Sequence, residues 1–71
     1  MRREVAEFVI YVINEVATCK GCSTSEVYHA LVKANGIQDY LVPFYDVLHT
    51  MDSRIVVEDV FKYLKKQGVA L

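Results

Sequence analysis

Residues 18–26 read TCKGCSTSE, and this stretch separates two segments with a helical pattern. Ser23 and Glu26 have the spacing of a capping box, in which the serine hydroxyl accepts the N–H of Glu26 and the carboxylate turns back to the amide of Ser23. A box of this kind contributes on the order of 1 kcal/mol to helix stability. We therefore expect one helix to end at about residue 19, Lys20–Gly21 to form the turn, and the next helix to begin at residue 23.

The segment before this turn, residues 4–19, has the 3.6-residue period of an amphipathic helix. Ile10 and Tyr11 flank its apolar stripe and widen it to more than half of the circumference. Such a helix is either central in the fold or covered by another chain. The stripe itself consists of Val5, Phe8, Val9, Val12, Ile13, Val16 and Cys19.

The second helix is expected over residues 23–35. Its spacing places His29 on the outer face. Asn35–Gly36 ends the helix, because Gly36 can adopt the left-handed conformation of a helix C-terminus. The buried stripe is expected to consist of Val27, Ala30, Leu31 and Ala34.

The third and fourth helices are expected over residues 39–50 and 56–67. Asp39 is the expected N-cap of the third helix, and Pro43 removes one backbone hydrogen bond, which kinks or shortens it. A short extended lead-in is expected near residues 54–57, where β-branched side chains dominate. The inward-facing residues are expected to be Tyr40, Leu41, Phe44, Val47, Leu48, Met51, Val56, Val60, Tyr63 and Leu64.

Length and composition agree with this pattern. The chain has 71 residues, 54% of them hydrophobic, and a formal net charge of −1. We expect an all-α fold, with residues 1–71 forming a single helical domain built as a compact bundle of four short helices. No apolar run approaches the roughly twenty residues of a membrane helix. Acidic residues interrupt the apolar stretch after Arg2–Arg3, so a signal peptide is not expected, and the predicted location is the cytoplasm, with reduced thiols.

Cys19 and Cys22 have the CxxC spacing of zinc ligands and of redox dithiols. A structural zinc needs four ligands, and the remaining candidates, His29 and His49, are expected on the outer faces of different helices. A redox dithiol needs a lowered thiolate pKa, whereas Cys19 closes a helix, where the dipole disfavours a thiolate. We expect no metal and no cofactor, with Cys19 as a small core side chain. Metal or redox chemistry at this pair is the third functional alternative.

Residues 24–34 and 39–50 have the layout of a helix-turn-helix motif, with a glycine in the connecting turn. A recognition helix presents Arg, Lys, Asn or Gln to bases and phosphates. Residues 36–52 contain no Lys or Arg and three Asp. Nucleic-acid binding is therefore the alternative function, disfavoured by charge and dependent on the basic residues near the two termini.

Asp46 and His49 are i,i+3 neighbours beside Tyr45, so the carboxylate can orient the imidazole. No nucleophile or metal can be assigned near them, and we assign no catalytic residue. Together with Ile10 and Tyr11 these three residues form a candidate interaction surface, since Tyr is enriched at interfaces. The leading hypothesis is a non-enzymatic protein–protein interaction module, either a homodimer or bound to a protein partner.

The runs DYLVPFYDVLHT (39–50) and IVVEDVFKYLKK (55–66), together with SEVY (25–28), resemble a family of very short bacterial proteins of unknown function, domain of unknown function 3791. The resemblance spans roughly residues 5–66. It implies a small helical intracellular protein and supplies no catalytic residues. Members lie beside other small genes, some resembling ADP-ribosyl-transferring enzymes, which implies an accessory or neutralising partner of a neighbouring gene product. Pro43 is a departure from the expected family pattern, and the cysteine pair carries none of the resemblance.

Overall fold

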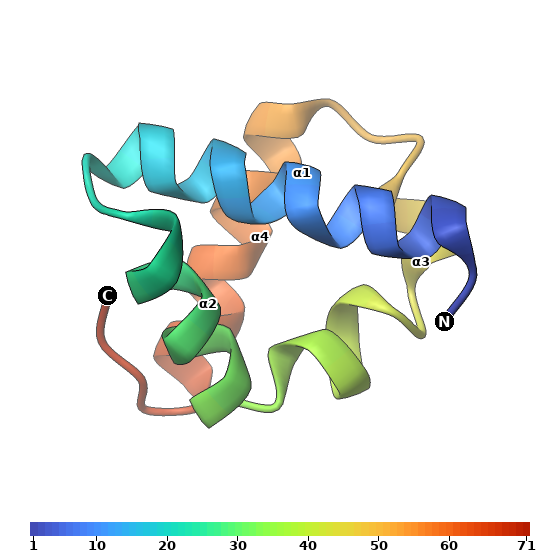
Figure 1. The fold of residues 1–71 in the computed structure, drawn as a ribbon. Coiled ribbons are helices and arrows are strands. Elements are labelled where there is room, and N and C mark those ends of the chain that lie inside the picture. Colours follow the sequence, from blue (N-terminus) through green and yellow to red (C-terminus); the bar gives the residue numbers. More distant parts are fainter.

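Helix α1 (Arg3–Lys20) is the longest element and the one against which the other long helices pack. In this computed structural model, which describes residues 1–71, α1 lies across α2 (Thr24–Lys33) and α4 (Ser53–Lys66) (Figure 1). A π-helix, η1 (Ile37–Leu41), and the single-turn α3 (Tyr45–Leu48) connect α2 to α4. There is no strand, so the predicted all-α class is confirmed. None of the helices combines the length and the apolar composition that crossing a bilayer requires.

The turn between α1 and α2 forms where the sequence predicts it. Gly21 adopts a left-handed conformation (φ 76°), and its N–H and that of Cys22 donate to the Ala17 carbonyl at 2.9 and 3.1 Å. The Ser23 hydroxyl accepts the N–H of Glu26 at 3.1 Å, which is the predicted N-cap bond of α2. Both helix ends are thus determined by groups within a few residues of the turn.

The central position of α1 explains its buried stripe but not Ile10 and Tyr11, the two residues that widen its apolar face, which are 58% and 47% exposed. The core is one cluster of 15 buried residues drawn from α1, α2, η1, α3 and α4, and it contains no buried polar or charged residue. Phe8, predicted to face inward, is half-buried against this cluster, and Cys19 is exposed, whereas Ala17 is buried in its place. The predicted stripe of α2 is confirmed, since Val27, Ala30, Leu31 and Ala34 are all buried.

The end of α2 differs from the prediction, because the helix ends at Lys33, two residues before the expected limit at residue 35. Asn35, not Gly36, adopts the left-handed conformation (φ 56°), and Gly36 is right-handed with φ −70°. A Cβ atom on Gly36 would lie 2.8 Å from Leu31 Cδ2 and 3.3 Å from Tyr63 Cε2. Glycine is needed here for close packing, so the left-handed position falls to asparagine, which tolerates it better than most residues.

The predicted helix over residues 39–50 is broken in two. The Val42 N–H donates to the Ile37 carbonyl, five residues back, at 3.0 Å, and Pro43 follows with no N–H to donate. The proline ring would clash with the carbonyl of Asp39 in a regular α-helix, and the wider π-turn relieves this clash. Asp39 therefore lies inside η1 and is not an N-cap. After the break, Phe44 leaves helical geometry with φ −102° and ψ 14°.

The break changes which side chains face the core. Leu41 and Leu48 are buried as predicted, and Tyr40 and Met51 are half-buried. Phe44 and Val47, predicted to face inward, are 53% and 59% exposed. The inward positions were predicted from one continuous helix across Pro43. The π-turn and the proline rotate α3 relative to such a helix, so Phe44 and Val47 face outward instead.

The predicted extended lead-in near residues 54–57 is wrong, because α4 begins at Ser53. The Asp52 side chain accepts the N–H of Arg54 at 2.9 Å and caps the helix. Val56 and Val57 are buried, so packing offsets the low helix propensity of valine. At the other end α4 stops at Lys66, close to the predicted limit at residue 67, and Gly68 is left-handed (φ 73°). The C-terminal residues 69–71 return along α2 (Figure 1).

Candidate functional site

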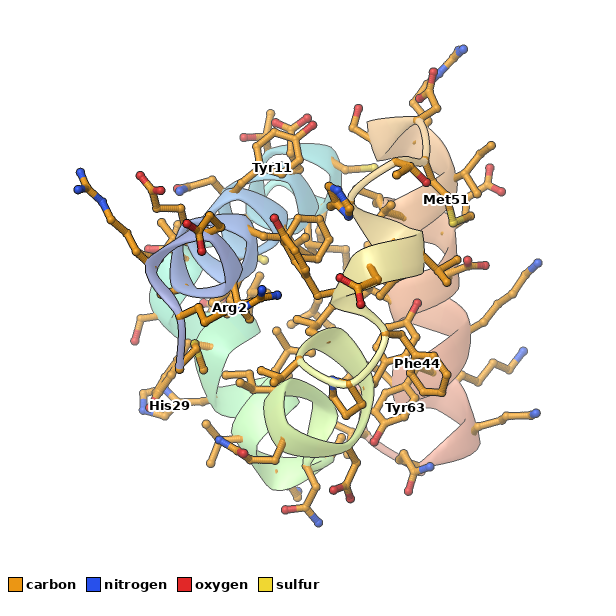
Figure 2. All side chains as sticks on the ribbon, turned by 90° about the vertical axis from the view of Figure 1, so that its right-hand side faces the viewer. Arg2, Tyr11, His29, Phe44, Met51 and Tyr63 are labelled. Carbon is orange, nitrogen blue, oxygen red and sulfur yellow. The ribbon has the colours of Figure 1, made fainter.

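A surface groove of about 820 Å³ lies between η1–α3 on one side and α4 on the other. Figure 2 shows Phe44 beside Tyr63 at one end of this region and Met51 at the other, near the start of α4. We call it the α3–α4 groove. Its apolar lining consists of Tyr40, Phe44, Val47, Leu48, Met51 and Tyr63, and its charged lining consists of Asp59, Lys62, Lys65 and Lys66.

Three aromatic rings hold one end of the α3–α4 groove in place. Tyr40 of η1 stacks on Tyr63 of α4 with ring centroids 4.8 Å apart and an interplanar angle of 9°. Phe44 lies against Tyr40 at a centroid distance of 6.3 Å. The Tyr63 hydroxyl donates to the Ala34 carbonyl at 2.8 Å and so ties α4 to the end of α2. Stacking and this hydrogen bond give the groove a preformed floor.

The Tyr40 hydroxyl is buried and has no hydrogen-bond partner. Burial raises the pKa of Tyr40 to about 12, and the nearby Asp59 carboxylate adds to the effect. A phenol is protonated at neutral pH even with its usual pKa, and the raised pKa of Tyr40 extends this to more alkaline solution, so the hydroxyl keeps an unused donor. Such a group is suited to donating a hydrogen bond, and it cannot act as a general base at neutral pH.

The predicted interaction surface is only partly brought together. Tyr45 lies edge-on to Phe8 of α1 with centroids 5.4 Å apart, and His49 stacks on Tyr45 at 4.4 Å. The Arg2 guanidinium lies 5.8 Å from the centre of the Tyr45 ring and 4.0 Å from the Asp46 carboxylate. These contacts join the start of α1 to α3.

The Asp46–His49 pair considered from sequence does not form. His49 Nδ1 lies 2.7 Å from the Tyr45 carbonyl, so this nitrogen carries the proton and donates to the backbone. Asp46 is exposed and directed to Arg2 instead. The imidazole is oriented by the helix backbone and by the Tyr45 ring, not by a carboxylate.

Ile10 belongs to a different surface. It is 58% exposed and lines a second hollow between α1 and α2, together with Met1, Tyr28 and Val32, and no charged side chain lines this hollow. Tyr11 is exposed on α1 and contributes to neither hollow. The five predicted surface residues are thus distributed over separate parts of the molecule.

The core contact expected of Cys19 is made by Cys22. Cys22 packs against the core, and Cys19 is exposed. Burial raises the pKa of the Cys22 thiol, and the Glu26 carboxylate raises it further, which is opposite to the shift of a redox-active thiol. Both thiols are free, and no group of three or more His, Cys, Asp or Glu side chains is placed to hold a metal ion.

The helix-turn-helix layout is not formed as the spacing predicts. Its second helix is interrupted between η1 and α3, so no continuous recognition helix extends over residues 39–50. The alternative of nucleic-acid binding depends on the basic residues near the two termini. Of these, Arg2 is directed to Asp46 and to the Tyr45 ring.

The α3–α4 groove is not part of the surface predicted from sequence. The sequence predicts its exposed apolar residues, Phe44 and Val47, to face inward, and its lysines stand out in the sequence only as basic residues near the C-terminus. Pro43 was the available signal, because a break at that position separates the register of α3 from that of η1.

Comparison with known proteins gives one finding. No curated protein and no solved structure matches the chain. A family model described as Protein of unknown function (DUF3791) matches residues 7–67. This range covers nearly the whole chain, as the resemblance of residues 25–28, 39–50 and 55–66 predicts. The chain therefore belongs to the DUF3791 family.

Proposed function

We propose that this chain is a non-enzymatic interaction module that binds a partner protein through the α3–α4 groove. The observation that carries the proposal is the exposure of Phe44 and Val47 beside Met51 and Tyr63 in one continuous hollow. Large apolar side chains that gather in a concave, polar-rimmed surface are typical of protein-binding sites.

The titratable groups of the groove favour binding over catalysis. Burial raises the pKa of Tyr40 to about 12, so its half-buried phenol stays protonated at neutral pH and well above it. The other ionisable groups, Asp59 and the three lysines, stand at the rim and on the surface, where no nucleophile lies beside a base. These features support recognition by shape, apolar contact and charge.

A partner of different sequence fits the groove better than a second copy of this chain. Two copies meeting groove to groove would bring Lys62, Lys65 and Lys66 of both molecules together, and like charges across an interface disfavour association. A homodimer through another face is compatible with the proposal. An accessory or neutralising role toward a neighbouring gene product would be one use of the groove.

The test is affinity capture from the native host with matched Val→Glu variants. Val47→Glu places a charge in the α3–α4 groove, and Val32→Glu places one in the hollow between α1 and α2. Both valines are about half exposed, so neither change should unfold the chain. We expect a co-purifying protein with the wild type and with Val32→Glu, and its loss with Val47→Glu.

The opposite pattern, loss with Val32→Glu and retention with Val47→Glu, would move the binding site to the hollow between α1 and α2. If no protein co-purifies with the wild type, the proposal of a partner fails altogether. Circular dichroism of each variant is the control for folding.

A further inference from the structure

The charged residues that line the α3–α4 groove all lie on α4 and are mostly basic. Lys62, Lys65 and Lys66 line the groove and are exposed, and Asp59 is its only acidic lining residue. The three lysines follow an i, i+3, i+4 spacing, so they occupy one face of α4 over about 6 Å of helix. None of them takes part in a salt bridge within the chain.

We propose that the occupant of the α3–α4 groove is an acidic amphipathic helix of the partner protein. This inference rests on the proposed function and names the chemistry of the partner. The apolar stripe of the helix contacts Phe44, Val47 and Met51. Its acidic flank faces Lys62, Lys65 and Lys66, which supplies opposite charges along one edge of the interface.

A helix is favoured by the geometry of the groove. The groove runs beside α4, which has 14 residues, and a helix of that length spans about 21 Å. Helices that dock in apolar grooves present anchors at i, i+3, i+4 and i+7, and acidic residues at the same spacing match the lysines of α4. The chain has no strand, so an extended peptide finds no sheet edge to pair with.

An anionic membrane surface is the competing occupant, because it also presents apolar and acidic groups. Membrane recognition uses clusters of about four to eight basic residues beside an exposed apolar face. Here three lysines border a hollow whose apolar side chains lie between two elements, which fits an inserted helix better than a flat surface.

The inference can be tested by selecting peptides from a displayed library of random sequences of roughly 15 residues, the length that matches α4. We expect the selected peptides to have apolar residues at helical spacing, flanked by Asp and Glu. Binding of the purified peptides should weaken as salt is added, since exposed charge pairs are screened.

The decisive variant carries Lys62→Glu, Lys65→Glu and Lys66→Glu together. Exposed ion pairs contribute about two- to fivefold each, so the loss of three pairs should weaken binding of the selected peptides by about eightfold or more. In its own selection it should enrich Lys- and Arg-flanked peptides, a reversal that a structural role of the lysines would not produce.

The matched control carries Lys20→Glu, Lys33→Glu and Arg54→Glu. It has the same net charge as the first triple variant, but none of its positions lines the α3–α4 groove. We expect it to bind the acidic peptides with nearly the wild-type affinity. Equal weakening in both triple variants would mean that net charge, not the rim of the groove, determines binding, and would overturn the inference.

The remaining outcomes separate this inference from the proposed function. The selected peptides could have neutral, basic or proline-rich sequences and still fail to bind the Val47→Glu variant. That outcome would overturn the inference of an acidic helix and leave the groove as the binding site. Peptides insensitive to Val47→Glu, or a selection without binders, would overturn both. Binding to phosphatidylserine vesicles without binding to any acidic peptide would assign the groove to a membrane surface.

Discussion

Tyr40 and Tyr63 stack on each other but differ in what their hydroxyl groups do. The Tyr63 hydroxyl donates to the Ala34 carbonyl at 2.8 Å, whereas the buried Tyr40 hydroxyl has no partner. A Tyr→Phe substitution removes one oxygen atom from either residue and leaves the stacked rings in place. The same chemical change should therefore have different effects on the free energy of unfolding.

The magnitudes follow from the cost of unpaired polar groups. Tyr63→Phe removes a net contribution of about 1 kcal/mol and leaves the Ala34 carbonyl without this donor, so we expect a loss of about 1–2 kcal/mol. Tyr40→Phe removes a hydroxyl whose desolvation is uncompensated. That variant should be at least as stable as the wild type, with a gain of up to about 1 kcal/mol.

Urea unfolding followed by far-UV circular dichroism measures both effects. For a small domain the dependence on urea is about 1 kcal/mol per molar, so the Tyr63→Phe midpoint should fall by about 1–2 M. Tyr28→Phe is the control, because that ring is exposed on α2 and its hydroxyl makes no hydrogen bond within the chain. Equal loss of stability in Tyr40→Phe and Tyr63→Phe would refute the assignment of these two hydroxyls.

Three further predictions concern local features. Gly36→Ala should destabilise the chain by about 1–3 kcal/mol, because its Cβ would lie 2.8 Å from the buried Leu31 side chain. The higher helix propensity of alanine, about 1 kcal/mol, offsets only part of this cost. Ser23→Ala should lower the melting temperature by about 4–8 °C in calorimetry, since it removes a cap bond worth about 1 kcal/mol. The raised pKa of Tyr40 favours the protonated phenol in the folded state. The contribution of this pKa shift to the free energy of unfolding is therefore complete below pH 10 and disappears as the pH rises through about 12.

Each of these predictions has a direct control. A Gly36→Ala variant as stable as the wild type would show that Leu31 moves aside at no cost. Ser25→Ala, inside α2, is the comparison for Ser23→Ala and should change the melting temperature less. For the alkaline effect, the stability difference between the wild type and Tyr40→Phe is measured across pH 9 to 12. A difference that does not change with pH would contradict the assignment.

The predicted interaction surface combines residues of one turn with residues that lie elsewhere in the fold. Tyr45, Asp46 and His49 are near neighbours along the chain, and Tyr45 packs on Phe8 of α1. Ile10 was grouped with them although it faces the hollow between α1 and α2. A helical pattern states which residues share a face of one helix, but it does not state which other helix that face meets.

The sequence by itself determined the helical class, the membership of the family, and where α1 ends and α2 begins. Those limits depend on Gly21, Ser23 and Glu26, whose hydrogen bonds connect residues no more than four apart. Interactions of such short range can be recognised in a linear sequence.

The tertiary structure alone decided the α3–α4 groove. Tyr40 and Tyr63 are separated by more than twenty residues, and they meet only because Pro43 and the π-turn redirect the chain after α2. It also decided that Asn35, not Gly36, takes the left-handed conformation, since only packing against Leu31 requires a residue without Cβ at position 36. In both cases the deciding contact joins side chains from different elements, and no local pattern contains it.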